Sequence, residues 1–209
     1  MAEDELVVYT YGFPYIDQTQ FMPLCTGVLS EDQARIVINL TLSNRKRFLS
    51  RCGLRTCIAD QANEMQEELN KVELFWNDII LYGMINYHHR KKAADIFTRI
   101  MRAVTRSIET DLTFHQYYHS ETGKPSGSIN TLTSLVPIGL FLYILGVTII
   151  NSTKVKILGS NPFPWPVTIR YQGLTIVHQE KKTLIIFSDG RNITVDNKQA
   201  QTISLDKLK

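Results

Sequence analysis

Apolar residues recur every three or four positions along two stretches of the chain. The first set is Met65, Leu69, Val72, Trp76 and Ile79, and the second is Phe97, Met101, Val104, Ile108 and Leu112. This spacing places each set on one face of an α-helix. A polar and basic segment, 86–92, follows Gly83 and separates the sets. We therefore predict two helices, one from near Ala59 and one ending past Thr113, whose apolar faces contact the core or each other.

The chain before these helices is expected to be an ordered arm followed by further helix. Residues 1–29 contain Gly12, Pro14, Pro23 and Gly27 among aromatic residues, with a short strand at 6–11. Ser30 followed by Gln33 resembles a capping box, which predicts a helix from Glu31. The β-branched segment 36–42 is assigned to helix, and a strand is the alternative.

The last quarter of the chain has the pattern of an antiparallel sheet. Short β-branched runs occupy 154–158, 167–172, 174–179, 183–187, 192–195 and 202–205. Asp189-Gly190 lies between two of them and is a strong hairpin turn signal. The proline-aromatic segment 161–166 is expected to be a rigid connector. We predict a small sheet or barrel of about five strands.

An uncharged segment joins the two halves. Residues 132–151 reach the length of about 20 that a membrane-spanning helix needs, but Pro137, Gly139 and Gly146 interrupt them. Two interpretations stay open, a membrane-inserted segment and a buried core. The membrane-facing residues would be Leu135, Ile138, Leu140, Phe141, Leu142, Ile144, Leu145, Val147, Ile149 and Ile150.

Together these patterns predict an α+β protein. The predicted regions are a mainly helical domain at 1–125 (helices at about 30–120), an apolar joint at 126–153, and a small β domain at 154–209. The apolar fraction of 44% and charged fraction of 21% are ordinary for a globular chain and exclude gross disorder. Three cysteines, an odd number, favour a reducing compartment over a disulfide-stapled fold. The acidic, polar-aromatic start does not resemble a cleaved signal peptide.

Two basic clusters stand out against a net charge of only +3. They are Arg45, Lys46, Arg47, Arg51 and Arg55, and Arg90, Lys91, Lys92, Arg99, Arg102 and Arg106. In the second cluster Arg99, Arg102 and Arg106 form a basic face beside the Phe97 stripe. Such a helix suits an anionic membrane surface, and the same charges suit the phosphates of nucleic acid. A solvated face balanced by the acidic segment 60–78 is the third interpretation.

Candidate catalytic chemistry is sparse. His115 and His119 would lie one helical turn apart, as in a zinc site, but Gln116 cannot act as the base of a zinc protease. The Cys52–Cys57 spacing is longer than in a zinc knuckle. The sequence contains no nucleophile elbow, phosphate-binding loop or dinucleotide fingerprint. We therefore expect no cofactor and no enzymatic activity.

The resulting hypothesis is a non-enzymatic structural or assembly protein at a membrane, either integral or on its cytoplasmic face. It would bind anionic lipid, protein partners or further copies of itself. Its general character is similar to that of viral matrix-type proteins, an analogy of architecture alone. The alternatives are a nucleic-acid-binding module that uses the basic clusters and a metal-dependent enzyme that uses His115 and His119.

Overall fold

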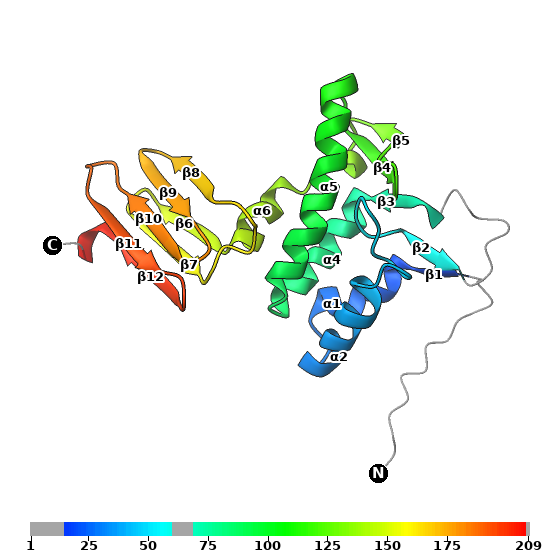
Figure 1. Ribbon diagram of the computed structural model, residues 1–209, viewed down its shortest axis with the longest axis horizontal. Helices are drawn as coiled ribbons and strands as arrows, with labels where there is room; N and C mark the ends of the chain where they lie inside the picture. The colour runs from blue at the N-terminus through cyan, green and yellow to red at the C-terminus, as the bar shows by residue number, and fades with distance from the viewer. Residues whose placement is uncertain (1–14, 60–68, 208–209) are drawn as a thin grey trace, which may run out of the picture.

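The protein has a helical lobe and a β lobe, joined through one short helix (Figure 1). The computed structural model describes residues 15–59 and 69–207. The predicted strand at 6–11 lies outside the described residues. Helices and antiparallel sheets coexist, so the predicted α+β class is confirmed.

In the part of the chain that the structure describes, the helical lobe has four α-helices: α1 (Met22–Thr26), α2 (Glu31–Ile36), α4 (Leu74–Asn86) and α5 (Arg90–Asp111). A capping box starts α2, because Gln33 N donates to Ser30 Oγ and Ser30 N donates to Gln33 Oε1. A π-helix at Val37–Leu42 continues α2. The helical prediction for this β-branched segment is therefore confirmed, and the strand alternative is wrong.

The second apolar stripe forms one face of α5 over most of its length. Phe97 and Val104 are buried and Met101 and Ile108 are half-buried, whereas Leu112 lies beyond the end of α5 and is exposed. Arg102 and Arg106 are exposed, as expected for the basic face. The prediction that the first apolar set lies on a single helix is wrong, because Val72 lies in a strand and α4 begins only at Leu74. Val72 pairs with Tyr118 in a sheet that buries both side chains, and this pairing outweighs the local helical spacing. Residues 60–68, and Met65 with them, lie outside the described residues.

Among the described residues, the helical lobe also has two small antiparallel sheets. They pair β1 (Tyr15–Asp17) with β2 (Cys57–Ala59), and β3 (Lys71–Glu73) with β4 (His115–His119) and β5 (Pro125–Ile129). The segment 115–119, expected to be helical, is thus a strand. The reason is local, since Leu112 adopts a left-handed conformation, with φ of 58°, and ends α5.

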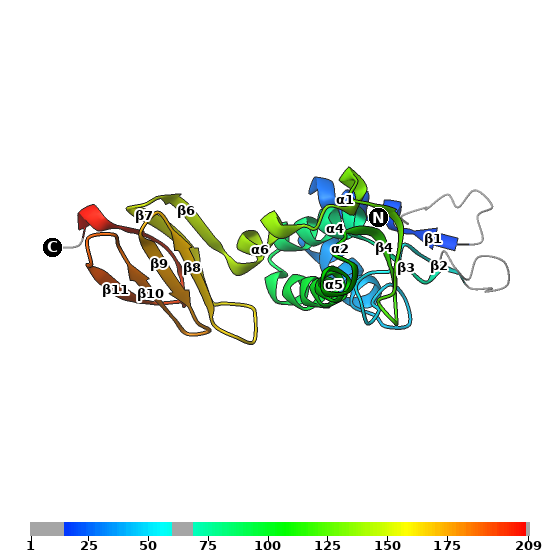
Figure 2. The same ribbon diagram turned by 90° about the horizontal axis from the view of Figure 1, so that it is seen from above.

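The β lobe holds two antiparallel sheets in two layers (Figure 2). One has the order β11-β10-β9-β8, and the other β12-β7-β6. The strands are β6 (Val147–Asn151), β7 (Lys154–Leu158), β8 (Val167–Tyr171), β9 (Leu174–His178), β10 (Lys182–Ile186), β11 (Asn192–Asp196) and β12 (Ala200–Ser204). The six expected segments are strands, with Asp189-Gly190 in the turn between β10 and β11. A seventh strand, β6, comes from the apolar run.

The apolar run is divided among three short elements. A 3-10 turn (Leu132–Ser134), helix α6 (Ile138–Leu145) and β6 follow one another. Within residues 15–59 and 69–207, no helix combines the length and apolarity needed to cross a bilayer. A spanning helix here was therefore a wrong alternative. Gly146 explains why, because its left-handed φ of +73° ends α6 and turns the chain into β6.

The run nevertheless supplies part of the core. Leu140, Ile144, Leu145 and Val147 are buried, Phe141 and Ile149 are half-buried, and Leu135, Ile138, Leu142 and Ile150 are exposed. One continuous cluster of buried side chains passes from the helical lobe, through α6, into the β lobe. The boundary between the lobes is thus packed like an interior.

Candidate binding site

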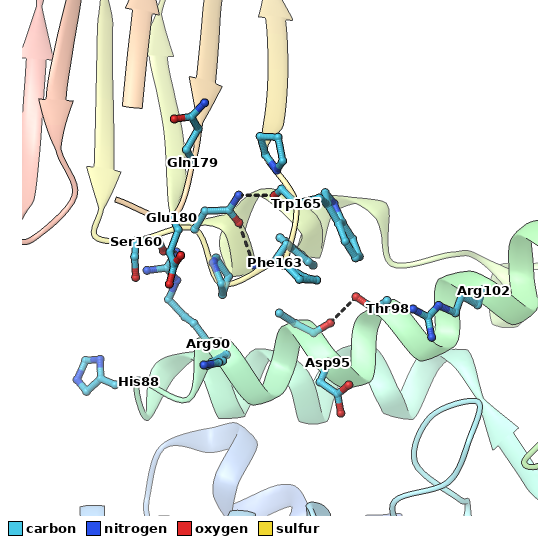
Figure 3. A pocket seen from close by; sticks show the side chains of 16 residues that line it. His88, Arg90, Asp95, Thr98, Arg102, Ser160, Phe163, Trp165, Gln179 and Glu180 are labelled. Carbon is cyan, nitrogen blue, oxygen red and sulfur yellow. Dashed lines mark hydrogen bonds between the residues drawn. The ribbon is translucent and has the colours of Figure 1, made fainter. Parts of the chain in front are cut away.

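A groove of about 990 Å³ lies between α5 and the loop that precedes β8 (Figure 3). Lys91, Asp95, Thr98 and Arg102 line it from α5. The opposite wall consists of residues 160–166 with Gln179 and Glu180, which follow β9. Concave sites with a few polar groups on a mostly rigid frame are the usual form of small-molecule pockets.

Buried Asn161 fixes the conformation of the loop. Its Nδ2 donates to the carbonyls of Trp165, at 2.9 Å, and His178, at 3.0 Å. Its Oδ1 accepts from Phe163 N at 2.9 Å. One amide side chain therefore closes the proline-aromatic segment on itself and attaches it to β9. The segment 161–166 is therefore an ordered wall of the groove as well as a connector.

Arg90 joins the loop to the helices from the other side. Its Nε donates to Ile144 O at 2.9 Å, and its Nη atoms donate to the carbonyls of Leu145, Leu158 and Ser160. Burial lowers the pKa of Arg90. Because an arginine side chain offers five N–H donors in a fixed fork, this residue holds α5, α6 and β7 in one arrangement.

Four aromatic rings extend from the core to the mouth of the groove. Phe97 and Phe163 are buried, and Phe141 lies between them, 5.2–6.0 Å from each by ring centroids. Trp165 stacks on Phe163 with centroids 5.7 Å apart and an interplanar angle of 25°. The Trp165 side chain is 43% exposed, so the series ends in an aromatic surface available to a ligand.

A second cavity, of about 680 Å³, adjoins the groove along α5. Both cavities are lined by Thr98, Arg102, Phe163 and Trp165. Phe97, Met101, Ile138 and Phe141 make the second one predominantly apolar. We call the first cavity the polar groove and the second the apolar hollow.

The charged side chains of the polar groove differ in whether they already form a salt bridge within the protein. Asp95 accepts from Arg99 Nε at 3.0 Å. Lys91, Arg102 and Glu180 form no salt bridge within the described residues. Two cations and one carboxylate therefore remain to contact a ligand, together with the Thr98 and Gln179 side chains.

A buried polar network lies behind the loop. His178 Nδ1 and Thr183 Oγ1 share a hydrogen bond of 2.5 Å, and Thr183 Oγ1 donates to Asn197 Oδ1 at 2.7 Å. His178 Nε2 has no hydrogen-bond partner within the described residues. Burial and the nearby Arg90 charge lower the pKa of His178 to about 4. The ring is therefore neutral at physiological pH. The backbone carbonyl of His178 accepts one of the hydrogen bonds from Asn161.

Each of the two predicted basic clusters contains side chains with protein partners and side chains that are exposed. Arg55 pairs with Glu121 at 2.6 Å, Arg99 donates to Ser50 O at 3.0 Å, and Arg90 is the structural link just described. Lys92 donates to Asn39. The exposed members are Arg45, Lys46, Arg47, Arg51, Lys91, Arg102 and Arg106. Arg90 therefore has a structural role, because its guanidinium group donates hydrogen bonds to backbone carbonyls.

The weak metal candidates have other partners. His115 Nε2 contacts Asp111 Oδ2 at 3.0 Å, and His119 Nδ1 accepts from Glu121 N at 3.2 Å. Asp111 has its pKa lowered by hydrogen bonds from Thr113 and His115. Cys25, Cys52 and Cys57 are not joined by disulfide bonds. In the described ranges no group of three or more His, Cys, Asp and Glu side chains could hold a metal ion.

Sequence reasoning missed most of the groove. Asn161, Phe163 and Trp165 were treated as parts of a connector, and Glu180 drew no attention. The available signal was the alternation of proline with aromatic residues at 161–166, because prolines that limit backbone freedom can hold an aromatic side chain at the surface. For Thr98 and Gln179 the sequence offers no comparable signal.

Comparison with known proteins gives a fold and no family. No protein-family model matches the chain, and no curated protein matches it. Twelve solved chains are similar. One of them is named "Sialidase", with 10% sequence identity and a TM-score of 0.54 over 93% of this chain and 21% of that one. The chain thus spans about a fifth of that sialidase, and both lobes take part in the likeness.

Proposed function

We propose that this chain is a non-catalytic binding module whose polar groove holds an oligosaccharide. The observation that carries the proposal is the exposed, pre-positioned Trp165 among hydrogen-bonding side chains. A pyranose ring has an apolar C–H face that packs flat against an aromatic ring, while its hydroxyl groups need donors and acceptors around the edge. The groove offers both at one place.

The Trp165 side chain is held in place before any ligand binds. Trp165 stacks on buried Phe163, and Asn161 holds the carbonyl of Trp165. The indole therefore loses little conformational freedom when a ligand contacts it. The Thr98 hydroxyl donates to Ala94 O at 2.7 Å, so it can only accept a hydrogen bond from a ligand. Lys91, Arg102 and Glu180 offer charge-assisted hydrogen bonds, which are stronger than neutral ones. Figure 3 shows Thr98 and Arg102 on α5, with Phe163 and Trp165 across the groove.

The fold comparison agrees with this choice of ligand. The two-lobed arrangement that frames the groove also occurs within a chain named sialidase, a name that denotes action on sialylated sugars. At 10% identity the likeness supports the frame of the site and none of its residues. The identity of the sugar is therefore left to the experiment.

The test uses tryptophan fluorescence, since the chain has only two tryptophans. In a Trp76→Phe background, Trp165 is the sole tryptophan, and its fluorescence should report titration with 3′-sialyllactose, lactose or maltopentaose. We expect saturable binding of at least one sugar. Calorimetry should show at least tenfold weaker binding after Trp165→Ala, because an aromatic contact is worth about 1 kcal/mol beyond its buried area.

Tyr171→Ala is the matched control. Tyr171 is an aromatic residue on β8 with 46% exposure, and it does not line the groove. Its removal should leave the affinity unchanged. If the sialylated and both neutral sugars all fail to bind the wild-type chain, the oligosaccharide proposal is wrong.

Assembly at an anionic membrane surface is a second proposal. It is favoured by the exposed Arg45, Lys46, Arg47 and Arg51, which lie close together in the chain between the π-helix and β2. Each well-placed basic residue contributes about 1 kcal/mol near an anionic bilayer. Nucleic acid would be attracted by the same charges.

Vesicle flotation distinguishes these alternatives. The chain should float with vesicles containing 30% phosphatidylserine at low salt, and a variant with Arg45, Lys46, Arg47 and Arg51 changed to serine should not. A matched variant with Lys154, Lys156, Lys181 and Lys182 changed to serine removes the same charge from the β lobe and should still float. Equal loss in both variants would show nonspecific attraction, and a salt-dependent shift with oligonucleotide alone would favour nucleic acid.

A further inference from the structure

The apolar hollow has the form of a site for a long, flexible apolar chain. Its floor is aromatic, with Phe97 and Phe163 buried and Phe141 half-buried. Met101 and Ile138 form its sides, and Ile138 is 66% exposed without a ligand. A concave apolar surface of this kind removes part of a bound apolar chain from water. Methionine adapts to irregular shapes, which suits a chain with many rotamers.

Two guanidinium groups lie at the margin of this hollow. Arg102 and Arg106 are one helical turn apart on α5, both line the cavity, and both are exposed. Neither forms a salt bridge within the described residues, although Glu109 lies on the same side of the cavity. On the same helix, Arg90 and Arg99 are occupied by carbonyl and carboxylate groups.

From this complementarity we infer that the apolar hollow binds one long-chain carboxylate. The acyl chain would lie on Phe97, Met101 and Ile138, with the carboxylate at Arg102 and Arg106. Arginine is suited to this role, because its planar fork matches both oxygens of a carboxylate. A volume of about 680 Å³ is within the range of cavities that enclose single small molecules.

The shape of the site favours a single molecule over a bilayer. A membrane surface would need the apolar side chains on a convex or flat face, whereas these residues line a concavity. This inference does not rest on the oligosaccharide proposal. Ile138, Phe141 and Arg106 line only the hollow, and Lys91 and Glu180 line only the groove, so the two sites can be tested separately.

Calorimetry with dodecanoate below its micellar concentration is the direct test. We expect one saturable site per chain. Hexanoate should bind at least a hundredfold more weakly, because the buried methylene groups supply most of the affinity. Dodecanol, which has the same tail without the charge, should bind at least tenfold more weakly. Equal affinity for dodecanol and dodecanoate, or uptake that does not saturate, would overturn the inference.

Substitutions of lining residues test whether dodecanoate binds in the apolar hollow. Ile138→Asn and the double change Arg102→Ala with Arg106→Ala should each reduce dodecanoate affinity at least tenfold. Arg170→Ala with Lys156→Ala removes two exposed charges from the β lobe and should have no effect. Ile138→Asn should leave oligosaccharide binding intact, and Glu180→Gln should leave dodecanoate binding intact. If phosphatidylserine vesicles bind and soluble dodecanoate does not, a bilayer is the ligand and the inference is wrong.

Discussion

Replacing Gly146 by alanine should lower the free energy of unfolding by about 3–5 kcal/mol. Two effects add at this position. Its φ of +73° is left-handed, and an added Cβ would lie 2.3 Å from Arg90 Nη2. The methyl group would force the half-buried guanidinium away from the carbonyls of Leu145 and Leu158, so these charge-assisted hydrogen bonds would be lost.

Gly190→Ala separates these two effects. Gly190 also has a left-handed φ, of +87°, but an added Cβ meets nothing within 4 Å. It should therefore show only the backbone effect, about 1–2 kcal/mol. Urea unfolding followed by circular dichroism measures both variants. Similar losses for Gly146→Ala and Gly190→Ala would show that the Arg90 contacts contribute little to stability.

Acidification should destabilise the protein through His178. The pKa of this buried ring is lowered from 6.5 to about 4 in the folded state. Between these values the unfolded chain binds more protons than the folded one, so stability falls as the pH falls. Stability should be unaffected by this residue above pH 7 and reduced by about 2–3 kcal/mol at pH 4.5.

His178→Gln isolates this contribution from those of the carboxylates. The variant keeps an amide near Thr183 and Asn197 but has no group that titrates. Its free energy of unfolding should change less between pH 7.5 and pH 4.5 than that of the wild type, by the same 2–3 kcal/mol. Identical pH dependence in both proteins would contradict the prediction.

The sequence predicted elements well where local pattern and tertiary structure agree. Helix α5 and the strands of the β lobe follow their periodicity, because each buries one face in the core. The start of α4 was wrong because Val72 is needed opposite Tyr118. The prediction of helix at 115–119 was wrong for a related reason. These residues pair with β3 and β5, and a short stretch of sequence does not show pairing with distant strands.

The site was harder to predict than the fold. The four carbonyls that bind Arg90 come from residues 54–70 positions away, so sequence alone placed this arginine on a basic surface. The amphipathic basic pattern of α5 was recognised, and Arg102 and Arg106 do lie beside apolar residues. What the sequence did not reveal is the wall opposite, because Asn161 and Trp165 reach α5 only through tertiary packing.

Trp165 and Arg102 belong to both cavities, which makes the two sites one thermodynamic system. A ligand that reorients either side chain in one cavity changes the affinity of the other. By linkage, the second ligand must change the first ligand's affinity by the same factor. Measuring dodecanoate affinity with and without saturating sugar would therefore give the coupling in both directions. A chain whose two cavities share four lining residues can respond to one ligand according to the concentration of another.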